Sequence, residues 1–209
     1  IKNTTGYSLN ALIDFDNEID IIAHLMIGSE GTLGFISSIT YNTVEEPKVK
    51  ASSIILFKDM YEACKFVADL KQEKNLVNAA ELMDRASLRS IEHKEDVDPS
   101  YKLLHDNVAS ILVECGSNSK EDLEIRIDKV KEISQKYKLV ENAKFEYDPK
   151  EYAKLWAIRK GTFPTVGAMR ESGTTVIIED VAFAVKDLAA GVIDLQELFK
   201  KYNYTEAII

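Results

Sequence analysis

The fold class of this chain is decided by residues 109–136, which read ASILVECGSNSKEDLEIRIDKVKEISQK. The first residues, Ala109 to Glu114, form a short apolar, β-branched run that predicts a buried strand. Residues 120–136 predict an amphipathic helix, because apolar side chains recur at helical spacing: Leu123, Ile127, Val130 and Ile133. A strand joined by a short polar loop to such a helix indicates a domain of mixed α and β structure.

The same alternation continues on both sides of this unit. We expect further strands at residues 51–57, 77–83, 143–147 and 174–183, and helices at residues 60–72, 85–92, 150–159 and 186–202. Single helices between the strands favour an α+β, ferredoxin-like fold with an antiparallel sheet and helices on one face. Glu45-Glu46-Pro47 marks a domain boundary. We therefore expect one domain over residues 1–46 and another over residues 47–209.

Composition excludes several classes of protein. The 209 residues carry 26 Lys+Arg against 35 Asp+Glu, a formal net charge of -9 that repels nucleic acids. No apolar run approaches the roughly 20 residues of a transmembrane helix. Cys64 and Cys115 are isolated, which argues against a disulfide framework or a zinc site and favours a reducing cytoplasm. We expect both cysteines to be small buried hydrophobes.

The first domain contains a glycine run, Gly28-Ser29-Glu30-Gly31-Thr32-Leu33-Gly34, between a short helix predicted at residues 19–26 and a strand predicted at residues 35–44. Its spacing differs from the Rossmann fingerprint, and no Gly-Lys-Ser/Thr follows as in a Walker loop. Two interpretations stay open. The glycines let the backbone approach a ligand closely, or they form a tight turn that binds nothing.

Several stretches resemble one flavoprotein family. Residues 2–7, KNTTGY, and 27–36, IGSEGTLGFI, resemble the end of the FAD-binding domain of vanillyl-alcohol-oxidase-type flavoproteins. Residues 80–84, 155–161 and 178–183 are similar to the substrate (cap) domain of FAD-linked D-lactate dehydrogenases and their D-2-hydroxyglutarate and glycolate relatives. Within this family the chain most resembles the large bacterial members, which also carry an iron–sulfur domain downstream. The resemblance implies that residues 1–46 end an FAD-binding domain, that residues 47–209 belong to the FAD-linked oxidase C-terminal domain, and that the chain is a fragment of a longer protein.

The resemblance also implies the site residues. The cofactor would be FAD, contacted by Gly28, Ser29, Gly31, Thr32, Gly34 and Ile36. Arg159 would hold the substrate carboxylate, for which a guanidinium is chemically suited. From the residues alone, a surface arginine at a helix end is the favoured interpretation of Arg159. We expect no catalytic residue within the chain, because the resemblance places the base in a histidine-rich motif downstream. We also expect no metal site, because the three histidines are scattered without metal-ligand spacing.

Other polar residues have structural interpretations. Glu81 and Asp84 flank a strand end and are expected to be a helix cap or a surface charge. His24 is expected to pack among apolar residues. Glu179 and Asp180 are adjacent on a predicted strand and so point to opposite faces, which rules out a paired acid and base.

The implied function is oxidation of a D-2-hydroxy acid, D-lactate, to the 2-oxo acid by hydride transfer to FAD, with residues 1–209 inactive alone. Alternatives are a D-2-hydroxyglutarate or glycolate dehydrogenase, or a non-catalytic α+β interaction module. Ile177 to Glu179 lack the lysine that some relatives place before the aspartate at the position of Asp180, which argues against a dicarboxylate. The resemblance further implies a separate electron acceptor, a homodimer, a 4Fe-4S cluster in a downstream domain, and a cytoplasmic location or one peripheral to the inner membrane.

Overall fold

The computed structural model describes residues 6–94, 97–174, 183–204 and 207–209. The chain divides into two compact units, which are described separately. Unit 1 comprises residues 1–45 and 176–183, and unit 2 comprises residues 46–175 and 184–209. The strand predicted at residues 174–183 falls almost entirely outside the described residues.

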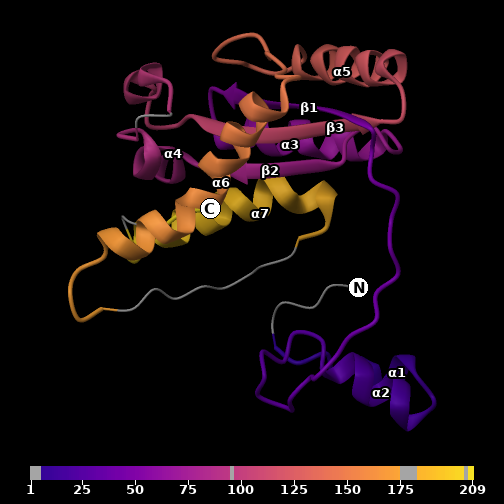
Figure 1. The fold of residues 1–209 in the computed structure, drawn as a ribbon. Coiled ribbons are helices and arrows are strands. Elements are labelled where there is room, and N and C mark those ends of the chain that lie inside the picture. The colour runs from indigo at the N-terminus through magenta and orange to yellow at the C-terminus, as the bar shows by residue number, and fades with distance from the viewer. Residues whose placement is uncertain (1–5, 95–96, 175–182, 205–206) are drawn as a thin grey trace. The chain divides into compact units, whose positions relative to one another are not determined.

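Unit 2 is built on a three-stranded antiparallel sheet of order β1-β3-β2 (Figure 1). Its strands are β1 (Val49–Phe57), β2 (Ala79–Met83) and β3 (Ala109–Ser117). Its helices are α3 (Met60–Gln72), α4 (Arg85–Ile91), α5 (Lys120–Ser134), α6 (Pro149–Met169) and α7 (Leu188–Lys201), with short 3-10 turns η1 (Pro99–Leu103) and η2 (Val185–Asp187). Both outer strands pair with β3 in antiparallel fashion, so β1 and β2 run parallel with β3 between them. This arrangement confirms the predicted α+β class and its antiparallel sheet.

Side-chain caps fix where four of these helices begin. The side chain of the residue before each helix accepts a hydrogen bond from a backbone N–H in the first turn, which satisfies a donor that the helix itself leaves free. These capping residues are Asp59, Asp84, Ser119 and Asp148. The prediction that Asp84 acts as a cap is confirmed.

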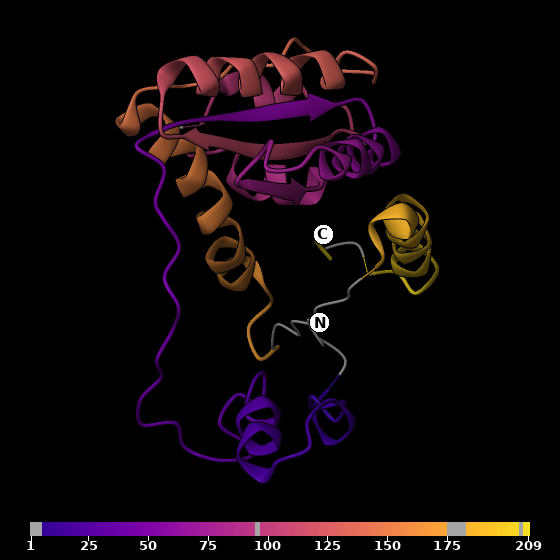
Figure 2. The same cartoon turned by 90° about the vertical axis from the view of Figure 1, so that its right-hand side faces the viewer.

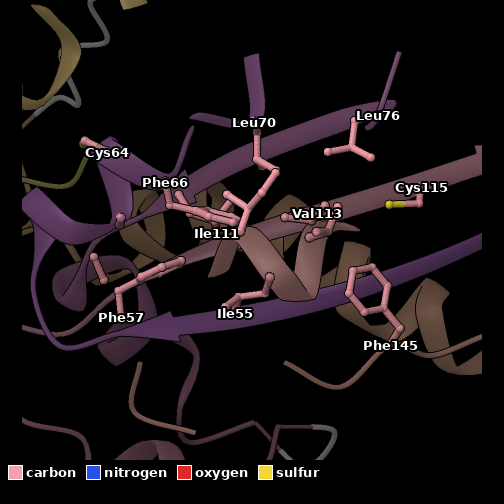
Figure 3. Packing of buried hydrophobic residues seen from close by; sticks show 14 of the residues in the cluster. Ile55, Phe57, Cys64, Phe66, Leu70, Leu76, Ile111, Val113, Cys115 and Phe145 are labelled. Carbon is pink, nitrogen blue, oxygen red and sulfur yellow. The ribbon is translucent and has the colours of Figure 1, made fainter. Parts of the chain in front are cut away.

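The main core lies on the face of the sheet toward α3 and α5. Ile55 of β1 and Ile111 and Val113 of β3 are at most 1% exposed, and they pack with Phe66 and Leu70 of α3 (Figure 3). The predicted apolar stripe of α5 is buried in the same cluster. The spacing of apolar residues in α5 therefore correctly identified its buried face.

Both cysteines belong to this core, as predicted. Cys64 and Cys115 have no exposed surface (Figure 3). Burial raises the pKa of the Cys64 thiol to about 11 and that of Cys115 to about 12. At neutral pH both thiols are therefore protonated, and neither is a nucleophile.

The opposite face of the sheet is also covered, so the prediction of helices on one face is wrong. A second cluster joins Leu56 of β1 and Leu112 of β3 to Leu88 of α4 and Ile158 of α6. Figure 2 shows α5 along one face of the strands, while α6 runs away from the other face. The central strand consequently has two buried faces, and its apolar residues run almost without interruption instead of alternating with polar ones.

Two elements of unit 2 differ from the prediction by more than shifted ends. The strand expected at residues 143–147 is reduced to one bridge, in which the backbones of Ser52 and Glu146 exchange hydrogen bonds of 3.0 and 2.8 Å. The helix expected to end at Arg159 continues to Met169, with Pro164 inside it. Arg159 therefore lies within a helix and not at its end.

Unit 1 contains two short helices, α1 (Ala11–Asp14) and α2 (Glu18–Leu25), followed by the glycine run. Asn17 caps α2 by accepting the N–H of Asp20 at 2.9 Å. His24 packs as expected, because its ring stacks on Phe15 with 3.8 Å between centroids. The strand predicted at residues 35–44 is wrong, since no ladder forms there in the described chain. β-branched composition cannot make a strand without a partner to bond its N–H and C=O groups.

Candidate functional site

Arg159 lies at the end of the N-terminal half of α6, which packs on the sheet, and it pairs with Glu81 of β2. Its Nε donates to Glu81 Oε2 at 3.1 Å, and the side chains of both residues are 40% exposed. The sequence interpretation of Glu81 as a cap or surface charge is therefore incomplete. Glu81 holds the residue that the resemblance assigns to the substrate carboxylate.

A second polar contact fixes α6 one turn earlier. Trp156 donates its indole N–H to Glu114 Oε2 of β3 at 3.0 Å, with Ser52 Oγ of β1 at 3.3 Å. Trp156 and Arg159 are three residues apart and therefore lie on one side of the helix. The register places Glu114 opposite Ala79, and Glu81 opposite Leu112, so both carboxylates belong to the same face of the sheet. These two contacts set the rotation of α6 about its axis.

A lysine completes the charge arrangement around Glu114. Lys50 Nζ lies 2.8 Å from Glu46 Oε1 and 4.0 Å from Glu114 Oε1. The hydrogen bond to Glu46 is the main reason why the pKa of Lys50 is raised, so the ammonium keeps its charge at neutral pH. Lys50 and Trp156 together engage both oxygens of Glu114.

The Arg159 guanidinium has more N–H donors than its contact with Glu81 uses. An arginine carries five N–H donors in a fixed planar fork. Among the residues that the structure describes, only its Nε donates, to Glu81. The Nη1–Nη2 edge can therefore bind one carboxylate through two parallel hydrogen bonds, the geometry for which arginine is suited.

The six predicted flavin contacts share one loop of unit 1. Two consecutive turns form it, since Ser29 N donates to Met26 O at 3.2 Å and Thr32 N donates to Ser29 O at 2.9 Å. The Thr32 hydroxyl donates to Ser29 O at 2.6 Å and lies 2.8 Å from Tyr7 Oη. Because the Thr32 hydroxyl proton is already used, the Tyr7 hydroxyl donates in that pair.

The loop can offer a ligand its backbone more readily than its side chains. The Thr32 hydroxyl is engaged within the loop and Ser29 is 3% exposed. Gly31 adopts a φ of +78°, which L-residues with side chains rarely adopt. Among the described residues, the N–H groups of Gly31, Leu33 and Gly34 make no hydrogen bond. Such donors suit the carbonyl groups of a flavin ring, so the loop is chemically compatible with FAD.

Unit 2 also contains a cavity of about 830 Å³ that sequence reasoning did not predict. It lies between the starts of α3 and α4, helix α7 and residues 207–209. Its charges largely neutralise one another: Arg89 pairs with Asp106 at 3.0 Å, and Lys138 pairs with Glu62 at 3.2 Å. Arg159 is not part of its lining. The cavity is therefore less suited to an anionic substrate than the Arg159 edge.

The structure separates the predicted residues into two groups. Gly28, Ser29, Gly31, Thr32, Gly34 and Ile36 follow one another in unit 1, and Arg159 belongs to unit 2. Sequence reasoning missed the partnership of Glu81 and the anchoring role of Trp156. No local signal reports either contact, because the partners are 78 and 42 residues apart. Within the described ranges, no three His, Cys, Asp or Glu residues cluster to hold a metal, and no helix is long and apolar enough to cross a membrane.

Comparison with known proteins identifies relatives of most of this chain. Residues 46–209 match the family described as FAD linked oxidases, C-terminal domain. The chain is 26% identical over 159 residues to the mitochondrial D-lactate dehydrogenase [cytochrome] 1 of Saccharomyces cerevisiae, covering 76% of this chain and 24% of that protein. It is 22% identical over 182 residues to Glycolate oxidase subunit GlcD of Bacillus subtilis, covering 87% and 37%.

Another relative and a solved structure agree with this match. The mitochondrial D-2-hydroxyglutarate dehydrogenase of Arabidopsis thaliana is 24% identical over 200 residues, covering 93% of this chain and 33% of that protein. A structure of alkyldihydroxyacetonephosphate synthase matches with a TM-score of 0.62 and 19% identity, covering 87% of this chain and 36% of that one. At this identity the likeness shows the fold. The chain spans between 24% and 37% of the length of these curated relatives.

Proposed function

Because this chain belongs to the family of FAD linked oxidases, C-terminal domain, we propose that it is part of a flavin-dependent D-2-hydroxy-acid dehydrogenase with D-lactate as the preferred substrate. The relatives named for D-lactate, D-2-hydroxyglutarate and glycolate support this reaction class. The observation that carries the proposal is the half-exposed guanidinium of Arg159, with its Nη1–Nη2 edge available for a carboxylate.

In this proposal, Arg159 binds and orients the substrate. A 2-hydroxy monocarboxylate has one permanent charge, and a bidentate guanidinium contact fixes both its position and its direction. FAD, when bound, supplies the oxidant by accepting the hydride from C2. The proton of the 2-hydroxyl leaves separately, so that the products balance as a 2-oxo acid and reduced cofactor. Trp156 and Glu81 keep α6 and its arginine in place for this contact.

We assign residues 1–46, which include all of unit 1 except residues 176–183, to the end of the FAD-binding domain. Their exposed apolar side chains support this assignment, since Phe35 and Val44 are each 92% exposed and Ile13 is 86% exposed. Their glycine loop would contact the flavin through the free N–H groups of Gly31, Leu33 and Gly34. In this proposal the flavin is contacted through backbone atoms at Gly28, Ser29 and Thr32. Ile36 contacts it through the exposed part of its side chain.

The test replaces Arg159 in the full-length protein loaded with FAD. A charge-assisted hydrogen bond contributes about 1.5–3 kcal/mol, so Arg159→Ala should lower kcat/KM for D-lactate by roughly ten- to a hundredfold. Arg159→Lys should restore only part of this loss, because an ammonium lacks the planar fork. Flavin content should stay at the wild-type level in both variants.

The same preparation decides between the alternatives. D-lactate, D-2-hydroxyglutarate and glycolate are compared by kcat/KM, and a higher value for either of the last two would replace D-lactate as the substrate. A full-length protein that bound no flavin and oxidised none of the three would instead support the non-catalytic interaction module. An unchanged kcat/KM in Arg159→Ala would contradict the role proposed for Arg159.

The remaining expectations rest on the resemblance alone and are tested on the same protein. Analysis of iron and acid-labile sulfide tests the downstream 4Fe-4S cluster, and light scattering tests the homodimer. Cell fractionation tests the cytoplasmic or inner-membrane-peripheral location. Residues 1–209 alone should purify colourless and inactive, and a stoichiometric flavin absorbance band would contradict that expectation.

A further inference from the structure

We infer that Glu81 is a positioning residue for substrate binding, because it holds Arg159 Nε and leaves the Nη1–Nη2 edge of the guanidinium for the substrate carboxylate. This inference rests on the proposed function of Arg159. It assigns Glu81 no contact with substrate or cofactor. Its basis is the 3.1 Å hydrogen bond between Arg159 Nε and Glu81 Oε2, together with the equal exposure of both side chains.

The chemistry of the guanidinium makes the choice of edge important. A carboxylate can bind arginine side-on, through Nε and one Nη, or end-on, through both Nη atoms. Glu81 accepts from Nε and so disfavours the side-on mode for an incoming ligand. The end-on mode is the one left, and it directs the substrate away from β2 along the axis of the arginine side chain. One glutamate therefore selects both the rotamer of Arg159 and the direction of binding.

Both Glu81 and Arg159 belong to regular secondary structure, β2 and α6. Glu81 lies within β2, in register with Leu112 of the buried central strand. Arg159 follows Trp156 by one helical turn, and the indole of Trp156 is bonded to Glu114 of the same sheet. An exposed ion pair adds little to stability, typically less than about 1 kcal/mol. The Arg159–Glu81 pair would therefore serve to orient the guanidinium rather than to stabilise the fold. Without Glu81, the long arginine side chain would sample many rotamers.

The experiment uses the FAD-loaded full-length protein with Glu81→Ala and Glu81→Gln. Glu81→Ala should raise KM for D-lactate roughly five- to tenfold while kcat changes less than twofold, because a mobile arginine weakens binding without altering the hydride transfer. Glu81→Gln keeps an oxygen that accepts from Nε and should stay within twofold of wild type. The matched control is Glu132→Ala, which breaks an exposed ion pair with Lys129 on α5 and should change neither constant.

A binding measurement accompanies the kinetics. Oxalate, a carboxylate that cannot donate a hydride, is titrated while the flavin absorbance is followed, and its Kd should rise in Glu81→Ala by the same factor as KM. The melting temperature should remain within about 2 °C of wild type. In an Arg159→Ala background, adding Glu81→Ala should have no further effect on KM or on the oxalate Kd, because the arginine to be positioned is gone.

The outcomes separate the two proposals. If Arg159→Ala itself leaves KM and the oxalate Kd unchanged, the proposed function of Arg159 has failed, and the role of Glu81 fails with it. If Arg159→Ala weakens binding but Glu81→Ala does not, the inference about Glu81 alone is overturned. A Glu81→Ala protein that melts earlier and loses kcat at constant KM would show a structural role and would also overturn it.

Discussion

At the scale of single residues, short polar side chains and glycines determine where the chain turns. Asp84 shows how one residue can serve the fold at an electrostatic cost. Its carboxylate caps α4 by accepting the N–H of Ser87 at 2.7 Å, yet only 7% of the residue is exposed. Burial raises the pKa of Asp84, and the hydrogen bonds from Ser87 and Ile209 and the charge of Arg89 offset this only in part.

We predict that Asp84→Asn stabilises the chain at pH 7. Asparagine caps a helix about as well as aspartate and carries no charge to bury. A carboxyl whose pKa is raised by folding contributes stability below its unfolded pKa, and this contribution is lost as pH rises through the folded pKa. The gain in melting temperature of Asp84→Asn over wild type should therefore shrink as pH falls through the folded-state pKa of Asp84.

The control is Asp84→Ala, which loses the helix cap and should lower the free energy of unfolding by about 1 kcal/mol. A melting temperature of Asp84→Asn below that of wild type at pH 7 would contradict the prediction.

The glycine loop gives a second prediction at this scale. Gly31 has a φ of +78°, whereas a Cβ on Gly34 would meet only the flexible end of Met26, with Cε at 2.9 Å. Side chains at positive φ cost roughly 1–2 kcal/mol, and β-branched ones are the least tolerated. In the full-length protein, Gly31→Val should lose flavin, while Gly34→Ala should keep nearly the wild-type content, measured by absorbance. Equal flavin content in both variants would show that the loop conformation is not needed for the cofactor.

At the scale of elements, a few specific contacts with the sheet hold α6. Its N-terminal half packs on the sheet through Ile158 and the Trp156–Glu114 hydrogen bond, and its second half contains Pro164. A proline inside a helix removes one backbone hydrogen bond. Arg159 belongs to the N-terminal half, which is held by its contacts with the sheet and precedes the proline.

We predict that Trp156→Phe destabilises unit 2 by about 1–2 kcal/mol, because Glu114, with 15% of its side chain exposed, loses a donor. The substitution removes the one tryptophan of the sequence and with it the tryptophan fluorescence signal. Unfolding in urea is therefore followed by circular dichroism. The control is Tyr147→Phe, which removes a 3.0 Å hydrogen bond to Glu124 at an exposed position and should cost less than about 0.5 kcal/mol. Equal losses in the two variants would show that the partly buried Trp156–Glu114 contact has no special role in holding α6.

At the scale of the whole molecule, the two units differ in how much apolar surface they bury. Unit 2 contains two clusters of buried hydrophobic residues. Among the described residues of unit 1, Ala11 is the only buried hydrophobic residue, while large apolar side chains such as Ile19 and Phe35 are exposed. Buried apolar area is the main source of folding free energy. Unit 2 should therefore be the more stable of the two.

Limited proteolysis of the 209-residue chain tests this difference. Chymotrypsin should cleave first after exposed aromatic residues of unit 1, such as Phe35 and Tyr41, which are 92% and 77% exposed. Cleavage needs local opening, and opening is least costly where few apolar contacts are broken. Mass spectrometry should then find a resistant fragment that begins near residue 46. Simultaneous loss of both units would show that they unfold together.

The local elements of unit 2 can be predicted from short stretches of sequence. The helices from Met60 and Lys120 begin where Asp59 and Ser119 cap them, because capping and hydrophobic periodicity involve residues within a few positions of one another. The resemblance to FAD-linked hydroxy-acid dehydrogenases also depended on local stretches, and the family match over residues 46–209 agrees with it.

Features that depend on partners distant in the sequence became visible only in the folded chain. Residues 35–44 are rich in strand-forming residues, yet a strand needs a neighbour, and the described chain gives them none. The second covered face of the sheet and the pairing of Arg159 with Glu81 depend on the strand order β1-β3-β2 and on its register. A slip of one residue would turn Glu81 to the opposite face. Register is set by the packing of the whole sheet, so no stretch of sequence around either residue could have predicted their contact.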